Sequence, residues 1–204
     1  MPKLGMQPIR RRQLILATIH CMSEYGFEHT TVARIGRAAH VSPSIIHHYF
    51  GGKDDLLEAS MRYLLEQLRQ TLVAHLNTSR DPRTRLDMIV AANFSDDQFS
   101  GEVLAAWMAL WGQAQHHPAL HRLYRVYAHR LRSNLRHALR PLLAAADLER
   151  ATFGVAALID GLWLNCSLSG EANGQLAREV ARNHIANLLG AVSTTPLTPE
   201  QAYD

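Results

Sequence analysis

The chain of 204 residues is poor in several residue types, and each shortage excludes a class of protein. It contains only two cysteines, Cys21 and Cys166, which lie far apart in the sequence. We therefore expect no disulfide framework and a reducing cytoplasm as the compartment. Valine and isoleucine are sparse beside alanine and leucine, which favours helices and predicts no sheet.

Motifs of common enzymes and of export signals are also missing. There is no glycine-rich phosphate loop, no Gly-x-Ser-x-Gly elbow and no His-Glu-x-x-His pair, so we expect that the chain is not an enzyme. The apolar stretch at residues 14–19 is too short for a signal peptide and lacks a cleavage pattern. The longest weakly charged run, residues 151–170, contains Asp160 in its middle and predicts a buried helix rather than a membrane span. We expect a soluble protein with no membrane partner.

Charge is distributed unevenly along the chain. Residues 1–53 hold seven Lys or Arg and two acidic residues, a net charge of +5, whereas the remainder carries −2. A basic lobe on a nearly neutral body favours a polyanionic partner such as DNA or an acidic membrane. The alternative is a basic face that only keeps the protein soluble.

Apolar periodicity and helix-ending residues predict an all-α fold with about nine helices. The first helix is expected at residues 10–25, with Gly26 as its stop, and two short helices follow at 32–39 and 43–49. A long helix begins at residue 53, and the second half is predicted to form helices that start near Pro82 and at 100–116, 118–145, 147–169 and 173–189. Pro141 is expected to kink or shorten its helix, and residues 192–204 are expected to be a disordered tail.

The two short helices lie in the basic quarter and are joined by a tight turn after a supporting helix. This arrangement predicts a helix-turn-helix with its recognition motif at residues 31–50, whose second helix enters the major groove of DNA. Ser42, Pro43, Ser44 and Ile45 lie at the start of that helix and are the candidates for base contacts, Ile45 through a thymine methyl group.

Other polar residues of this region are candidates for contacts to the DNA backbone. Tyr49 and Lys53 are predicted to bind phosphates. Arg10 and Arg11, with Arg12, are predicted to precede the first helix and to reach the backbone or the minor groove, and a solvated basic arm is the alternative. The remaining predicted DNA-binding residues share a hydrogen-bonding side chain on the outer face of the motif: Thr31, His47 and His48.

Residues 31–56 resemble the TetR family of transcriptional repressors. The family signature is matched in register at ten positions: Thr31, Ile35, Ala39, Val41, Ser42, Ile46, Tyr49, Phe50, Lys53 and Leu56. The sequence departs from it at Gly36, His40, Ser44 and His47, and His40 is expected to adopt a left-handed backbone conformation. The resemblance implies a helix-turn-helix DNA-binding domain of three helices at residues 8–68 and a helical effector-binding and dimerisation domain at residues 69–191.

Further stretches resemble a branch of this family that responds to choline and controls glycine betaine synthesis. They include residues 1–15, 46–50, 106–111 and 156–164. This resemblance implies a ligand-responsive repressor of choline-to-betaine genes that choline releases from DNA. The alternative within the family is a repressor of other genes that responds to a different small molecule.

A small cationic effector is also compatible with the aromatic residues of the second domain. Trp107 and Trp111 are four residues apart and Asp160 and Trp163 three apart, so each pair shares a helix face. Aromatic faces and a fixed negative charge together select a quaternary ammonium group. We add Tyr127 and Asn93 to this predicted ligand-binding site. The alternative is that the tryptophans are ordinary core residues and Asp160 pairs within a dimer interface.

The predicted partners follow from these assignments. We expect a double-stranded DNA operator, and a homodimer that packs through the last two long helices as a four-helix interface. The expected location is cytoplasmic, associated with the nucleoid when DNA is bound. No cofactor is expected beyond the effector. The resemblance further implies that the effector favours a spacing of the two helix-turn-helix units that no longer fits successive major grooves.

A histidine-rich, metal-binding helical protein is the alternative from another class. The chain contains twelve histidines, and His117 and His121 have helical i,i+4 spacing next to His116. No cysteine or acidic residue clusters with them, so we expect no metal site. A helical adaptor that does not bind DNA is a further alternative, but it leaves the basic quarter and its short capped helices unexplained.

Overall fold

The computed structural model describes residues 6–76, 78–171 and 173–193. This described part consists of helices without strands, which confirms the predicted all-α fold of about nine helices. In chain order the helices are α1 (Met6–His29), α2 (Val32–Ala38), α3 (Pro43–Phe50), α4 (Lys53–Leu76), α5 (Pro82–Asn93), α6 (Gly101–Gln113), α7 (Pro118–Leu139), α8 (Ala145–Ser169) and α9 (Gly174–Ser193).

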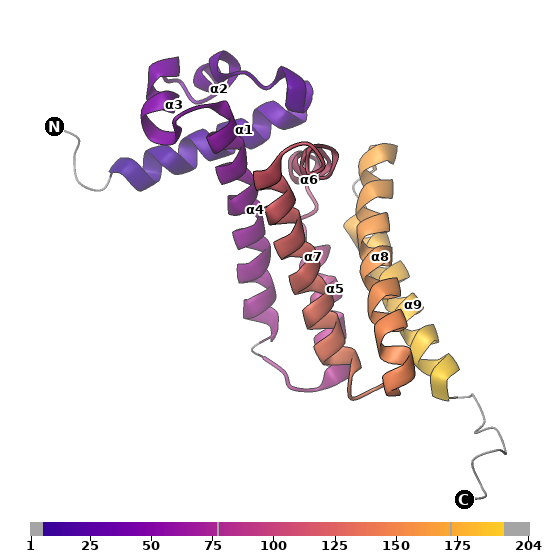
Figure 1. The fold of residues 1–204 in the computed structure, drawn as a ribbon. Coiled ribbons are helices and arrows are strands. Elements are labelled where there is room, and N and C mark those ends of the chain that lie inside the picture. Colours follow the sequence, from indigo (N-terminus) through magenta and orange to yellow (C-terminus); the bar gives the residue numbers. More distant parts are fainter. Residues whose placement is uncertain (1–5, 77, 172, 194–204) are drawn as a thin grey trace, which may run out of the picture.

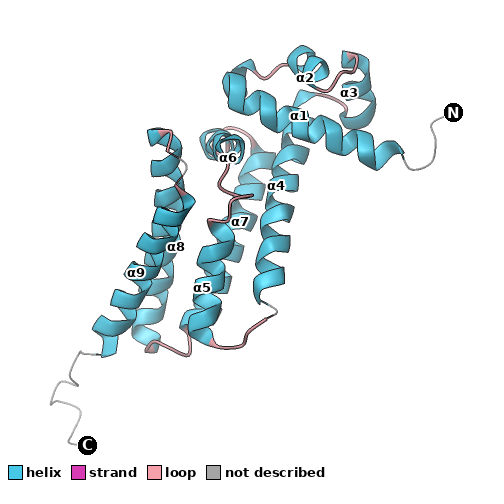
Figure 2. Ribbon diagram, turned by 180° about the vertical axis from the view of Figure 1, so that it is seen from behind, coloured by secondary structure: helices cyan, strands magenta, loops and turns pink. Residues whose placement is uncertain are grey.

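The helices form a small unit at one end and a larger bundle (Figure 1). Helices α2 and α3 lie on one side of α1, while α4 leaves this unit and runs into the bundle beside α5 and α7. Helices α8 and α9 lie together along the far side of the bundle. Helix α6 crosses the others near α1 and is seen almost end-on in both overall views (Figure 2). It therefore lies between the small unit and the bundle.

Capping residues explain where several helices begin. The side chain of Thr31 accepts a hydrogen bond from the backbone N–H of Arg34 at the start of α2, and Asp81 does the same for Thr84 at the start of α5. Helices α3, α5 and α7 each have proline in the first turn, where a missing N–H costs no helical hydrogen bond. Local sequence therefore fixes most of the helix starts.

Three predicted boundaries need correction. Helix α1 starts at Met6, so Arg10 and Arg11 lie inside the helix and do not form an arm that precedes it. Helix α7 ends at Leu139, just before Pro141, and not at residue 145 as predicted. Helix α9 continues through Ser193, so the first two residues of the expected tail are helical, and residues 194–204 lie outside the described part.

Two hydrophobic clusters form the core. The smaller cluster joins the first four helices through Leu14, Cys21, Ile35, Ala39, Ile46, Phe50 and Leu56. The larger cluster fills the bundle and also includes Ile19 and Met22 of α1 and Leu57 and Met61 of α4. Helices α1 and α4 therefore contribute to both clusters, and the domain boundary proposed at residues 68 and 69 falls within the continuous helix α4.

Helix α8 is long and apolar enough, by length and composition alone, to cross a membrane. One of its faces packs into the core, where Ile159 is fully buried and Trp163 is 3% exposed. The opposite face leaves Phe153, Leu164 and Leu168 exposed at 64%, 41% and 74%. The predicted burial of residues 151–170 thus holds for one face of the helix in a single chain.

Candidate nucleic-acid interface and effector pocket

The polar start of α3 is open to solvent at the outer end of the molecule. Ser42, Pro43 and Ser44 are exposed, Ile45 is half-buried, and the hydroxyl oxygens of Ser42 and Ser44 lie 2.8 Å apart. In the next turn His47 and His48 are exposed, while Ile46 on the opposite face is fully buried. The helix therefore presents short polar side chains outward, as close approach to base edges requires.

The turn before α3 has a strained but well-defined geometry. His40 has a φ of 52°, which confirms the expected left-handed conformation. The N–H of Val41 donates to the carbonyl of Gly36 at 2.8 Å, and a Cβ on Gly36 would lie only 2.9 Å from the Val41 carbonyl oxygen. Close backbone packing at Gly36 therefore sets the angle between α2 and α3.

Helix α1 supports both short helices. The guanidinium of Arg11 donates to the carbonyl of Tyr49 and lies 4.1 Å from the centre of the Phe50 ring. Gln13 donates to the carbonyl of Ala39 at 2.7 Å, and Arg10 donates to the side chain of Gln13 at 2.7 Å. Arg11 thus contacts the end of α3 within the protein itself.

The predicted phosphate-binding residues lie around the far end of α3. Tyr49 is half-buried, and its ring meets that of His48 edge-on at 5.2 Å. Lys53 begins α4 with its ammonium group 5.4 Å from the centre of the Phe27 ring. Thr31 is exposed at the start of α2. The structure therefore distributes these side chains over the ends of three helices around the exposed face of α3.

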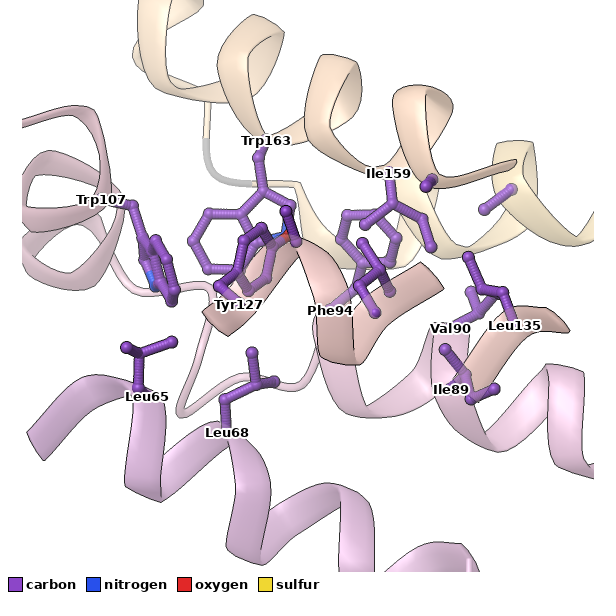
Figure 3. Close-up of a cluster of buried hydrophobic side chains, with 14 of the residues drawn as sticks. Leu65, Leu68, Ile89, Val90, Phe94, Trp107, Tyr127, Leu135, Ile159 and Trp163 are labelled. Carbon is purple, nitrogen blue, oxygen red and sulfur yellow. The ribbon is translucent and has the colours of Figure 1, made fainter. Parts of the chain in front are cut away.

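Five of the six predicted effector residues lie together in the bundle. The ring of Trp107 is 4.9 Å from Tyr127, 5.7 Å from Trp163 and 6.4 Å from Trp111, measured between ring centres. Figure 3 shows Trp107, Tyr127 and Trp163 pointing toward one another from three different helices. Trp107 and Trp163 are nearly fully buried, at 2% and 3% exposure. These two tryptophans form part of the core behind the site.

Tyr127 and Asp160 form the polar centre of this cluster. The Tyr127 hydroxyl donates to Oδ1 of Asp160 at 2.6 Å. Burial raises the pKa of Asp160, while the hydrogen bond from Tyr127 and the charge of Arg132 act against that rise. Burial, and after it the negative charge of Asp160, raises the pKa of Tyr127 well above its ordinary value. The hydroxyl therefore keeps its proton and acts as a hydrogen-bond donor to the carboxyl group.

A pocket of about 480 Å³ opens beside Asp160 between α6, α7 and α8. Of the six predicted residues, Trp111 and Asp160 line it. Its other lining residues are Ala114, Gln115, His121, Tyr124, Gly161 and Leu164. Tyr124 was not predicted, although its i,i+3 spacing from Tyr127 could have indicated it. A carboxylate and two aromatic rings therefore border one opening, which suits a small organic cation.

Asn93, the sixth predicted residue, lies elsewhere. It is 2% exposed on α5, and its amide donates to the carbonyl of Ile89 at 2.8 Å. It lines a separate groove of about 330 Å³ between α4, α5 and α7, and Tyr127 lines this groove as well. Leu65 and Leu68, visible below Tyr127 in Figure 3, also line that groove.

Helix α6 connects this pocket to the helix-turn-helix unit. Near its start, Glu102 contacts Nδ1 of His20 on α1 at 2.9 Å. At its end, the amide of Gln113 donates to Glu28, also on α1, at 3.2 Å. Trp107 and Trp111 lie between these two contacts on the same helix. Helix α6 is therefore joined to α1 by side-chain contacts near both of its ends.

The histidines considered as metal ligands are dispersed. His117 is the N-cap residue of α7 without a side-chain hydrogen bond to the helix, and its ring lies 5.9 Å from that of Phe27. His121 borders the effector pocket. Within residues 6–76, 78–171 and 173–193, no three His, Cys, Asp or Glu side chains are grouped as metal ligands would be.

Sequence comparisons assign both halves of the chain to one family. Residues 14–60 match "Bacterial regulatory proteins, tetR family", and residues 82–190 match "BetI-type transcriptional repressor, C-terminal". The chain is 46% identical over 191 residues to the HTH-type transcriptional regulator BetI of Burkholderia mallei, which covers 93% of this chain and 98% of that protein. The chain belongs to the TetR family.

Other members of the family support this assignment. The BetI regulator of Klebsiella pneumoniae is 47% identical over 173 residues, which are 84% of this chain and 89% of that protein. A TetR regulator from Haloarcula marismortui superposes with a TM-score of 0.79 at 22% identity, covering 91% of this chain and 98% of that structure. A regulator from Saccharomonospora viridis, solved in complex with choline, superposes with a TM-score of 0.72 at 20% identity, covering 88% of this chain and 95% of that structure.

Membership of this family establishes the general activity of the chain. TetR-family regulators bind DNA operators and act as dimers, so the chain is a DNA-binding transcriptional regulator. Its relatives are transcriptional regulators rather than enzymes, which confirms the prediction that the chain is not an enzyme. The BetI-type C-terminal match confirms the predicted branch of the TetR family.

Proposed function

We propose that this TetR-family regulator represses genes for the conversion of choline to glycine betaine and is released from its operator by choline. The single observation that carries the proposal is the pocket beside Asp160. Its carboxyl group lies at one opening with the aromatic residues Trp111 and Tyr124. The BetI-type match and the choline bound by the Saccharomonospora viridis regulator support the same ligand class.

The chemistry of the pocket fits a quaternary ammonium ion with a hydroxyl group. Such an ion has no N–H to donate, so recognition depends on aromatic faces and a fixed negative charge, each aromatic contact contributing about 0.5 to 2 kcal/mol. The indole N–H of Trp111 is buried and has no hydrogen-bond partner among the described residues. Because this nitrogen has almost no exposed surface, a choline hydroxyl can bond to it only if the Trp111 ring turns toward the pocket.

We assign the DNA contacts from the exposure of α3 and its surroundings. Ser42, Pro43, Ser44 and Ile45 are assigned to base edges, because they lie at the exposed start of the helix. The residues assigned to the phosphates and sugars are Thr31, His47, His48, Tyr49, Lys53 and Arg10. Arg11 is assigned an indirect role, because its guanidinium is already bonded to the end of α3.

We assign the dimer interface to the exposed apolar side chains of α8 and α9. We call it the α8–α9 face; its exposed apolar residues are Phe153, Leu164, Leu168, Leu176 and Val180. Gly154 and Gly161 lie on the same helix with open space where a side chain would be, which lets a second helix approach closely. Two such faces pack as a four-helix interface in a cytoplasmic dimer that associates with the nucleoid through its operator.

The route from effector to DNA in this proposal runs through α6. Choline in the pocket contacts Trp111 on α6, and α6 is joined to α1 by the His20–Glu102 and Gln113–Glu28 contacts. A shift of α6 therefore changes the orientation of each helix-turn-helix unit. The two units then no longer match successive major grooves of one duplex.

A titration with choline and with its neutral carbon analogue, 3,3-dimethylbutan-1-ol, tests the effector assignment. The two molecules have the same shape, so only the charge differs. We expect choline to quench tryptophan fluorescence and to release an operator fragment, and the analogue to do neither at the same concentration. Asp160→Asn abolishes the response, whereas Asp96→Asn, in an exposed loop, retains it. Equal binding of the two molecules would show that the pocket takes a different kind of ligand.

A further inference from the structure

We infer that the effector pocket is incomplete in one chain and is closed by the second copy, so that the effector binds to the dimer. The inference rests on the proposed function, because it concerns the same pocket. It adds that the partner subunit is part of the binding site.

The position of Asp160 on α8 is the first observation. Ile159 and Trp163 on the neighbouring side of the helix are buried, and Phe153, Ala157 and Leu164 on the other side are exposed. At 100° per residue, Asp160 lies at the border between these two sides. Its carboxyl group therefore lies at the edge of the α8–α9 face and not deep within the bundle.

The hollows around Asp160 open onto that same face. The pocket that contains Trp111 is bordered by Gly161 and Leu164, both exposed residues of α8. A second hollow of about 300 Å³ on the other side of the carboxyl group is bordered by Phe153 and Ala157, also exposed. Residues of the proposed dimer interface thus form the rim of both hollows.

The size and openness of the pocket are the second observation. Its volume of about 480 Å³ lies within the range of about 300–1,000 Å³ that holds drug-sized ligands, and choline is much smaller. Four lining residues are exposed in the single chain, namely Gln115, His121, Gly161 and Leu164. Binding pockets bury most of the surface of their ligand, and cation–π contacts are strongest away from water. A single chain leaves both requirements unmet.

A second copy of the chain is the occupant that fits this opening. TetR-family regulators act as dimers, and α8 and α9 carry further exposed apolar residues, Leu168, Leu176 and Val180, in addition to those next to the opening. When a second copy covers these residues, it also covers the rim at Leu164 and Gly161. Its side chains exclude water from the open side of the pocket and occupy the space that choline leaves unfilled.

Linkage gives this arrangement a consequence for regulation. If choline binds each pocket of the dimer more tightly than the single chain, choline must strengthen the dimer by that factor once for each of the two pockets. Release from the operator then cannot occur by dissociation into monomers. It must occur by a change in the relative orientation of the two helix-turn-helix units.

A charged pair of substitutions on α9 tests the inference without altering the pocket. Leu176→Glu with Val180→Glu places two carboxylates on the α8–α9 face. These residues are 55% and 39% exposed in the single chain, and neither borders the two hollows next to Asp160. We expect a folded monomer, by sedimentation and circular dichroism, whose choline affinity is lower by about 10-fold or more. The matched control is Leu16→Glu on α1, a residue of similar exposure at 44% that borders neither of these hollows, which should keep the wild-type dimer and affinity.

A second measurement covers the case in which the double variant does not fold. Sedimentation of the wild-type protein over a dilution series, with and without saturating choline, should show that choline lowers the dimer dissociation constant by about 100-fold or more, the square of the roughly 10-fold effect expected for each of the two pockets. A monomeric variant with wild-type choline affinity, an unchanged dissociation constant, or a double variant that stays dimeric would overturn the inference. Absence of choline binding by the wild-type dimer would instead overturn the proposed effector.

Discussion

Tyr127 and Asp160 show how single residues control the effector site. The carboxyl group is partly buried, which raises its pKa, and the Tyr127 hydroxyl offsets part of that rise by donating a hydrogen bond. A cation needs the ionised carboxylate. The protonation state of Asp160 therefore decides whether the pocket holds a negative charge.

The first prediction concerns the pH dependence of choline binding. For an acid with a raised pKa, the carboxylate is present above that pKa and is lost as the pH falls through it, so choline affinity should decrease on acidification with a midpoint above the ordinary range of aspartate. Tyr127→Phe removes a hydrogen bond to the charged form and should raise the midpoint further above that of the wild type. Calorimetric titrations over a pH series measure both midpoints, and a lower midpoint in the variant would contradict the assigned role of Tyr127.

The second prediction separates base contacts from phosphate contacts on α3. Lys53→Ala removes one charge next to the recognition helix and should weaken binding to every DNA sequence similarly, by about 1 kcal/mol or more. Ser44→Ala leaves the charge unchanged but alters the exposed start of α3, so it should change sequence preference. Binding-site selection with both variants gives the comparison. Identical preference profiles for Ser44→Ala and the wild type would remove Ser44 from the base contacts.

The sequence predicts single residues well where local geometry determines them. The left-handed conformation of His40 follows from its place in the turn, and the outward polar face of α3 follows from helical periodicity. The sequence predicts less well which residues of distant helices line the same pocket. Asn93 and Tyr127 line a different groove from Trp111, and Tyr124 was missed, because helix packing decides which pocket a side chain meets.

At the scale of elements, α6 is the connection between the two functional regions. It carries Trp107 and Trp111 toward the bundle, and it contacts α1 through one residue near each of its ends. Neither contact is predictable from the sequence, because His20 and Glu102 are separated by 82 positions. Helix starts, in contrast, were predictable from capping residues such as Asp81 and Ser100, and the end of α7 from Pro141.

The third prediction tests α6 as the route of the signal. Glu102→Gln weakens the contact to His20 on α1 and changes no residue of the pocket or of α3. We expect the choline affinity of the free protein to be unchanged. The ratio of operator affinities without and with choline should be about 5-fold smaller in the variant than in the wild type. Glu149→Gln, which removes an exposed acid on α8, is the control. If Glu102→Gln leaves the response to choline intact, the signal reaches α1 by another route, such as α4.

At the scale of the whole molecule, the basic DNA-binding unit and the proposed dimer interface lie in different parts of the structure. The basic first quarter of the chain forms the helix-turn-helix unit, while the apolar α8–α9 face lies on the far side of the bundle (Figure 1). Dimerisation through that face leaves the α3 helices of both subunits accessible to DNA. The sequence indicated the basic quarter and the last two helices as partner surfaces. The exposed apolar face of α8 required the structure, because composition does not tell whether an apolar helix is covered by its own chain or by a partner.

The fourth prediction uses salt to count how many helix-turn-helix units hold the operator. Each protein–phosphate contact releases counterions, so the logarithm of the binding constant decreases with the logarithm of the salt concentration, with a slope proportional to the number of contacts. Without choline both units of a dimer engage one duplex. If choline turns the units so that only one can enter its groove, the slope should fall to about half its value, together with the affinity.

Measurements of operator binding at several potassium chloride concentrations, with and without saturating choline, distinguish this mechanism from its rivals. Lys53→Ala serves as calibration, because loss of one phosphate contact in each unit should reduce the slope by about two for the dimer. An unchanged slope with lower affinity would mean that every phosphate contact persists and that choline disturbs base contacts alone. A slope that depends on protein concentration would mean that choline separates the subunits, contrary to a pocket that the second copy closes.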